Sequence, residues 1–169
     1  MDSTSAAAIR VHRFLETEPV IWLSSIRTDG APHLVPTWFV WDGETIVIRS
    51  KPHARKVRNL AHDPRAMLAL GDAEDDFDVG LLEARADVTV GDAEAPAPLP
   101  SGFVAKYRDR IEALGLTPAE FAATYSATIR LTPARALGWH GRSRPRSWFD
   151  AVRRLAFGRP TVAVAAGAA

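Results

Sequence analysis

The chain contains no cysteine among its 169 residues. Disulfides, thiolate nucleophiles, iron–sulfur clusters and cysteine-based zinc sites are therefore excluded, and a reducing compartment fits best. No apolar run approaches the ~20 residues that span a membrane. Residues 1–8 also lack the charged-then-apolar order of a signal peptide. We therefore expect a cytoplasmic protein with no stable membrane insertion.

The sequence also lacks the short motifs that mark common catalytic sites. It has no glycine-rich dinucleotide fingerprint, no Walker pattern and no nucleophile elbow, and its five histidines are scattered. Metal catalysis is not expected, and neither a catalytic nor a metal-binding residue is assigned. Chemistry in such a protein would come from a bound cofactor.

Charge is nearly balanced overall, at +1, but unevenly distributed along the chain. Nine of the 20 acidic residues lie between positions 72 and 94, whereas residues 130–160 hold eight arginines and one acid. This distribution argues against bulk binding of nucleic acid and for local anion sites.

The pattern that remains is that of a small barrel. Alternating apolar residues predict strands at about 20–26, 34–41, 45–49, 66–70, 77–90 and 125–131, with an extended piece near 135–139. Helices are predicted at about 8–17, 52–62, 102–114 and 118–124; the last begins with a threonine N-cap, an N1 proline and an N3 glutamate. Six short strands and few helices indicate a mainly β fold, a closed antiparallel barrel with flanking helices.

A basic corner follows the third predicted strand. Arg49 and Ser50 end that strand, Lys56 lies one turn into the next helix, and Arg55 and Asn59 share one helix face. Phosphate binding needs several converging donors, and a helix N-terminus adds free N–H groups and a positive dipole end. A solvated basic face is the usual outcome of a charge run, so the residues alone leave both interpretations open.

The second predicted strand carries large side chains on both faces. One set comprises His33, Val35, Thr37, Phe39 and Trp41, and the other comprises Leu34, Pro36, Trp38 and Val40. One face can fill a barrel while the other offers a platform to a flat heterocycle or a partner subunit. Pro36 cannot donate a ladder hydrogen bond, so this strand should lie at an edge or contain a bulge.

The chain after residue 141 differs from the rest. We treat 1–141 as the cofactor-binding domain and 142–169 as a basic C-terminal extension. Residues 147–157 could form a short amphipathic helix, which we expect to pack on its own barrel or a second subunit rather than on lipid. Residues 161–169 should fray, and deletion of 142–169 should leave cofactor binding largely intact.

An ordered set of motifs resembles a known family. It consists of Leu23-Ser24-Ser25, Asp29-Gly30, Pro36-Thr37-Trp38-Phe39, Asp42-Gly43, Lys56-Val57-Arg58-Asn59-Leu60 and Asp63-Pro64-Arg65. These residues resemble the pyridoxamine 5′-phosphate oxidase-like split-barrel flavoproteins, and more narrowly the subgroup that uses the deazaflavin coenzyme F420. Residues 105–108, 120–126 and the strand ending near Gly138-Trp139 also resemble that subgroup, so the likeness covers roughly residues 10–140.

The resemblance implies a homodimer of six-stranded antiparallel split β-barrels, of the FMN-binding type, with cofactor sites at the subunit interface. It implies a phosphate at the basic corner, a ring against the second strand, and further contacts from the start and middle of the fifth strand, in the same or the second subunit. The cofactor-binding set expected from the corner, the strand and the resemblance is Val35, Pro36, Thr37, Trp38, Arg49, Ser50, Lys51, Arg55, Lys56, Asn59, Phe77, Asp78 and Asp87.

The function that the resemblance implies is an F420-dependent oxidoreductase, which transfers a hydride between the deazaflavin and a small organic acceptor such as a quinone or enone. Two alternatives stay open. An FMN-dependent oxidase or reductase could use the same corner, and a non-catalytic binder of heme, another tetrapyrrole or stored flavin could use His33, His53 or His140 as an axial ligand. Pyridoxine-phosphate oxidation itself is not expected, because the extended basic C-terminal signature is missing. The acceptor and the direction of turnover depend on pocket shape and are not encoded in local pattern.

Overall fold

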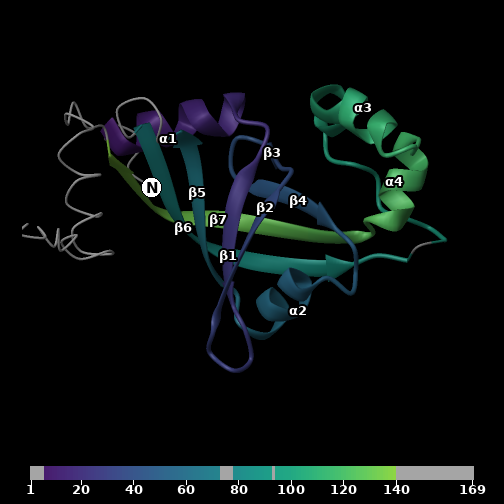
Figure 1. Cartoon of the computed structure of the whole chain (residues 1–169), viewed down its shortest axis with the longest axis horizontal. Coiled ribbons are helices and arrows are strands. Elements are labelled where there is room, and N and C mark those ends of the chain that lie inside the picture. The colour runs from purple at the N-terminus through teal and green to yellow at the C-terminus, as the bar shows by residue number, and fades with distance from the viewer. Residues whose placement is uncertain (1–5, 73–77, 93, 140–169) are drawn as a thin grey trace, which may run out of the picture.

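The computed structural model describes residues 6–72, 78–92 and 94–139. Its elements are α1 (Ala6–Thr17), β1 (Ile21–Ile26), β2 (Pro32–Thr37), β3 (Val40–Trp41), β4 (Ile46–Ser50), α2 (Arg55–His62), β5 (Arg65–Asp72), β6 (Asp78–Val90), α3 (Phe103–Ala113), α4 (Pro118–Thr124) and β7 (Ala127–Trp139) (Figure 1). No helix in this part of the chain is long and apolar enough to cross a membrane. The predictions for Phe77, His140 and the 142–169 extension lie outside the described residues.

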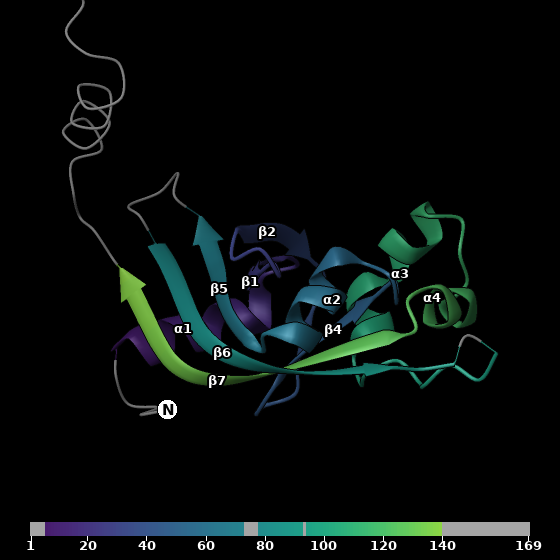
Figure 2. The same cartoon turned by 90° about the horizontal axis from the view of Figure 1, so that it is seen from below.

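The described strands form one antiparallel sheet in the order β2-β1-β5-β6-β7-β4-β3. The two edge strands, β2 and β3, follow each other in the chain and are separated only by Trp38 and Phe39. The sheet must therefore curl until its edges approach each other, and Figure 2 shows this curvature along β6 and β7. The mainly β split-barrel fold is confirmed. It has seven strands here instead of six, because the predicted strand 34–41 is divided in two.

Local features explain where the strands bend and end. Pro36 lies in the edge strand β2, as its missing N–H requires. Strands β6 and β7 pair over almost their whole length with one register shift, between Glu83 and Ala84, where Ala134 of β7 has no partner in the register. The strand predicted at 125–131 and the extended piece near 135–139 are therefore one continuous strand that contains a bulge.

The sheet separates two hydrophobic clusters. The barrel interior includes Phe39, Ile46 and Ile48, whereas Val40 and Val47 face a second cluster beneath α3 and α4. The alternation predicted for the second strand is confirmed at Phe39 and Val40. All five residues of β4 are buried, because both of its faces are covered. Arg49 consequently extends from β4 on the side of Val47, toward α4 rather than into the barrel.

The prediction that Pro52 lies in the first turn of α2 is wrong. The helix begins at Arg55, and its N-cap residue Ala54 has an extended backbone and donates its N–H to the carbonyl of Lys51. Residues 51–54 form a turn that precedes the helix, and Arg55 and Lys56 are therefore the first two residues of α2. The predicted capping box of α4 is confirmed: Thr117 accepts the N–H of Glu120, whose carboxylate accepts the N–H of Thr117 at 2.7 Å.

Candidate functional site

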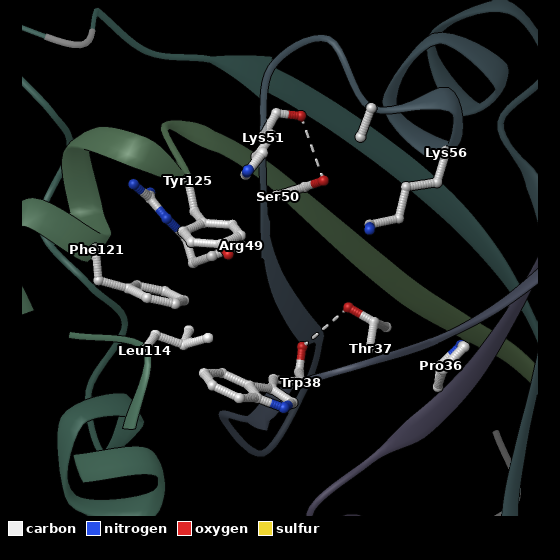
Figure 3. A pocket seen from close by; sticks show the side chains of 11 residues that line it. Pro36, Thr37, Trp38, Arg49, Ser50, Lys51, Lys56, Leu114, Phe121 and Tyr125 are labelled. Atoms are coloured by element: carbon white, nitrogen blue, oxygen red, sulfur yellow. Dashed lines mark hydrogen bonds between the residues drawn. The ribbon is translucent and has the colours of Figure 1, made fainter. Parts of the chain in front are cut away.

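A pocket with a volume of about 290 Å³ opens where the end of β2, the end of β4 and the turn into α2 meet α3 and α4 (Figure 3). Its lining consists of Pro36, Thr37, Trp38, Arg49, Ser50, Lys51, Ala54, Lys56, Leu114, Phe121 and Tyr125. Seven of the thirteen expected cofactor-binding residues are among them. The basic corner and the platform of the second strand are thus two walls of one pocket.

Arg49 is the most unusual group in this lining. Its side chain is only 5% exposed, and its guanidinium donates to the Thr128 hydroxyl at 2.7 Å and to the Ala122 carbonyl at 3.1 Å. The buried Nε has no partner, and the guanidinium pairs with no carboxylate of the described residues. Burial lowers the pKa of Arg49. A buried cation without a counter-charge is costly, so this arrangement favours an anionic ligand.

Two lysines and a serine complete the cationic wall. The half-buried Lys56 ammonium points toward the open middle of the pocket in Figure 3, and burial lowers its pKa. The Lys51 ammonium lies 5.8 Å from the centroid of the Tyr125 ring, within the range of a cation–π contact. Ser50 is buried, and its hydroxyl makes only a long contact of 3.4 Å with the carbonyl of Lys51. The pocket lining includes three cations and no carboxylate.

The opposite wall is aromatic. The Trp38 ring lies nearly parallel to the rings of Tyr107 and Phe121, with centroid distances of 5.0 and 5.8 Å. Phe121 in turn stacks on Tyr125 at 4.3 Å. These rings and Leu114 offer a flat, water-excluding surface facing the cations, which suits a ligand that combines a planar ring with an anionic group.

Sequence reasoning did not assign Leu114, Phe121 and Tyr125 to the site. A signal for two of them was available, because Tyr125 directly follows the helix predicted at 118–124 and is four residues after Phe121, which is the spacing of neighbours on a helix face. Leu114 follows the last residue of α3 and had no local signal.

Three expected site residues on β2 and α2 do not line the pocket. Asn59 is buried and donates to the Ser25 hydroxyl at 3.1 Å, which links α2 to β1. Arg55 is exposed on the same helix, and Val35 lies opposite Leu23 in the sheet. Their assignment to the cofactor stays a prediction, and the structure gives Asn59 a separate role in packing.

The expected acidic residues lie elsewhere. The Asp78 carboxylate pairs with Arg10 of α1 at 2.6 Å and also with Arg13. Asp87 lines a different cavity, of about 310 Å³, and Arg49 borders both this cavity and the pocket. Any role of Asp78 or Asp87 toward a cofactor stays a prediction.

No histidine is among the residues that line the pocket. His33 lies on β2 with a buried Nδ1 that has no partner, and burial followed by the positive charges of Arg55, Lys56 and Arg27 lowers its pKa. His33 is therefore mainly neutral near pH 7. In the described part of the chain there is no group of three or more side chains that could hold a metal ion.

The family model described as pyridoxamine 5′-phosphate oxidase matches residues 8–140, a range that includes all seven strands of the sheet. The chain belongs to the pyridoxamine 5′-phosphate oxidase family. All the residues that line the pocket of this family member lie within the matched region.

Solved structures with the same fold are named for different functions. An F420 reductase is 21% identical with a TM-score of 0.56, covering 75% of this chain and 94% of that chain. A conserved hypothetical protein from Mycobacterium tuberculosis is 27% identical with a TM-score of 0.61, covering 82% and 86%. The heme storage protein HutZ from Vibrio cholerae is 16% identical with a TM-score of 0.56, covering 81% and 98%. No curated protein matches the sequence significantly. The likenesses at this level show the fold, and the ligand has to be inferred from the chemistry of the pocket.

Proposed function

We propose that this protein binds coenzyme F420 in the pocket and acts as an F420H2-dependent reductase of a small organic acceptor, such as a quinone or enone. The proposal rests on the buried Arg49 guanidinium, which pairs with no carboxylate of the described residues and lies beside the aromatic wall of the same pocket. An anionic cofactor would supply the missing counter-charge and place its ring against the aromatic side chains.

Each wall has a distinct part in this proposal. Ser50, Lys51 and Lys56 hold the phosphate together with Arg49, while Trp38, Phe121 and Tyr125 hold the ring and exclude water. When bound, the reduced deazaflavin supplies the hydride, and a proton from solvent completes reduction of the acceptor. The lining has no carboxylate or histidine to act as a general acid, and in this proposal its two lysines bind the phosphate. The contribution of the chain is therefore binding and orientation, which can supply much of the rate.

FMN is the second candidate cofactor, because it presents the same kind of flat tricycle and a phosphate to the same donors. The two cofactors differ beyond the phosphate, where F420 carries a lactyl and oligoglutamate tail. Lys51, Arg55 and Arg58 are exposed around the turn into α2 and could neutralise that tail. Heme is not proposed, because no histidine of the described residues lines the pocket to serve as an axial ligand.

We also propose that a second copy of the chain covers the outer face of β1, β2 and β5. Trp22, Leu34 and Met67 are 47%, 57% and 37% exposed on this face. Ser24 pairs with both Leu34 and Met67, and the neighbouring Trp22 pairs with Pro36, so these side chains share one side of the sheet. Pro36 also lines the pocket, so a partner seated on this face would lie beside the cofactor.

An anaerobic turnover assay tests the reductase proposal. Reduced F420 is mixed with the protein and a quinone such as menadione, and the return of the absorbance of oxidised F420 is followed. We expect oxidation that depends on the protein and saturates with both reactants. Saturable binding of F420 without protein-dependent turnover of any quinone or enone would refute the reductase and leave a cofactor-binding protein.

A further inference from the structure

The two edge strands of the curled sheet, β2 and β3, are joined by a link of two residues, which we call the seam of the barrel. Strand β2 ends at Thr37 and β3 begins at Val40, so Trp38 and Phe39 take part in none of the strand pairings of the described sheet. Phe39 is nevertheless completely buried. Its backbone N–H and carbonyl therefore need hydrogen-bond partners that a neighbouring strand does not provide.

The hydroxyl of Tyr107, on α3, supplies both partners. It accepts the Phe39 N–H at 2.9 Å, and its single hydrogen lies within reach of the Phe39 carbonyl at 2.7 Å and the Pro19 carbonyl at 2.9 Å. Burial raises the pKa of Tyr107 to about 12, against a smaller lowering by the hydrogen bond with Phe39, so the donor is retained at neutral pH. One side chain thus replaces the missing strand and ties the seam to the segment that precedes β1.

The ring of the same residue fixes the orientation of Trp38. The rings of Tyr107 and Trp38 lie 5.0 Å apart with an interplanar angle of 6°. The ring centroids of Tyr107 and Phe103 lie 4.9 Å apart, and the Phe103 ring in turn packs against Phe121, which lines the pocket. Trp38 is therefore held through its backbone neighbour and through its ring, and Figure 3 shows its indole along one side of the pocket.

The geometry points to Tyr107 as a positioning residue of this pocket: it does not line the cavity but acts through Trp38 to set the slot that admits a flat conjugated ring. The proposed phosphate donors lie on β4 and near the start of α2. Among the described residues, the hydroxyl of Tyr107 forms hydrogen bonds with Phe39 and Pro19 and not with these donors. Loss of its hydroxyl should therefore impair binding of the ring and spare binding of a free anion. The identity of the ring rests on the proposed function, whereas the structural role of Tyr107 does not.

The role of Tyr107 in holding Phe39 and Trp38 is tested without any ligand, by NMR of the 15N-labelled protein. In the wild type we expect the Phe39 amide to exchange with solvent as slowly as amides of the flanking strands. In Tyr107→Phe it should exchange at least about tenfold faster, and the indole N–H signal of Trp38 should shift. Ile111→Val, a change in the same helix and cluster, controls for general loss of stability and should alter neither signal. Rapid exchange of Phe39 in the wild type, or no change in Tyr107→Phe, would overturn the inference.

The role of Tyr107 in ligand binding is tested by measuring the affinities for FMN and F420 and the inhibition constant of inorganic phosphate, a competitor that has no ring. Tyr107→Phe should weaken the affinity for whichever ring-bearing cofactor the wild type binds by roughly tenfold, with an unchanged inhibition constant for phosphate. An equal loss for phosphate would overturn the positioning role in favour of a loosened fold. Binding of neither cofactor by the wild type would refute the proposed function, and the exchange measurement would still decide the role of Tyr107.

Discussion

At the scale of single residues, the pocket is defined by positive charges that no carboxylate of residues 6–72, 78–92 and 94–139 neutralises. Arg49 and Lys56 are both withdrawn from water, and neither forms an ion pair within the described residues. Desolvation without a partner destabilises the ligand-free protein, and a bound phosphate would reverse that cost. Charged groups that lower the stability of the free protein but favour an anionic ligand are typical of functional sites.

Lys56 offers the most direct test of the cationic wall. Lys56→Ala should weaken binding of F420 by about 1.5–3 kcal/mol, the scale of a lost charged hydrogen bond, measured by fluorescence titration. Arg108→Ala is the matched control, because it removes the same charge from an exposed position on α3 that does not line the pocket. Equal losses in the two variants would mean that only net charge matters and would place the phosphate elsewhere.

Asp42 gives a prediction about pH. Burial would raise its pKa, but hydrogen bonds from the N–H groups of Thr45 and Glu44, the Thr45 hydroxyl and Arg130 outweigh that effect and lower the pKa to about 2. A carboxylate whose pKa is lower in the folded state stabilises the fold above its unfolded pKa, and that stability is lost as the pH falls toward the folded value. We expect the stability contributed by Asp42 to disappear between about pH 3.8 and about pH 2.

Urea unfolding at several pH values checks this prediction in the wild type and in Asp42→Asn. The variant should have the lower free energy of unfolding at neutral pH and the shallower decline in acid. The effect should be modest, since the Asp42 side chain is 41% exposed and the solvent screens its interactions. Parallel curves for the two proteins would show that the turn carboxylate contributes nothing.

At the scale of elements, the sequence predicted local structure well and long-range closure less well. The boundaries of α4 follow from its capping box, and the edge position of β2 follows from Pro36. The break at Trp38 and Phe39 was missed because the apolar alternation continues through it without interruption. Only a side chain 68 residues away, Tyr107, compensates for the missing ladder, and no local pattern reports such a contact.

The same limit applies to the candidate site. The basic corner comes from one short stretch of the chain, so the sequence alone was enough to propose Arg49, Ser50, Lys51 and Lys56. The aromatic wall depends on how α3 and α4 fold back over β4, which brings Phe121 and Tyr125 to a strand more than 70 residues earlier. Spacing can indicate that two rings share a helix face, but it cannot say which surface they meet.

The capping box of α4 should support the aromatic wall. Thr117→Ala should lower the free energy of unfolding by about 1 kcal/mol, because the helix loses a side-chain acceptor for the N–H of Glu120. A helix of seven residues has little other means of maintaining its first turn. Chemical denaturation compares this variant with Thr124→Ala, the same substitution at the exposed last residue of the helix. A cost no larger than that of the control would show that the cap is unimportant.

At the scale of the whole molecule, the curled sheet brings residues from its two edges to one pocket and leaves an apolar outer face beside it. Strands β2 and β4 contribute from near the two ends of the sheet order, and the helical pair α3–α4 closes the space between them. The exposed Trp22, Leu34 and Met67 adjoin the same region through β2. A single fold therefore accounts for the proposed cofactor site and for the proposed subunit contact.

The proposed dimer is tested by the mass of the protein in solution. Trp22→Glu should convert the dimer to a monomer, because it places a charge in the middle of the apolar face. Ile9→Glu is the control, since Ile9 is 62% exposed on α1, away from β1 and β2. Size-exclusion chromatography with light scattering reports both masses. A monomeric wild type, or a dimer that survives Trp22→Glu, would contradict the assignment of this face.

The central claim is that the pocket binds a deazaflavin cofactor through unpaired cations and an aromatic wall. The most direct test is a fluorescence titration of the purified apo-protein with F420, beside an identical titration with FMN. We expect saturable binding of F420 at micromolar concentration or below, with FMN binding much more weakly. Tighter binding of FMN would make this a flavin protein, and binding of neither cofactor would contradict the claim altogether.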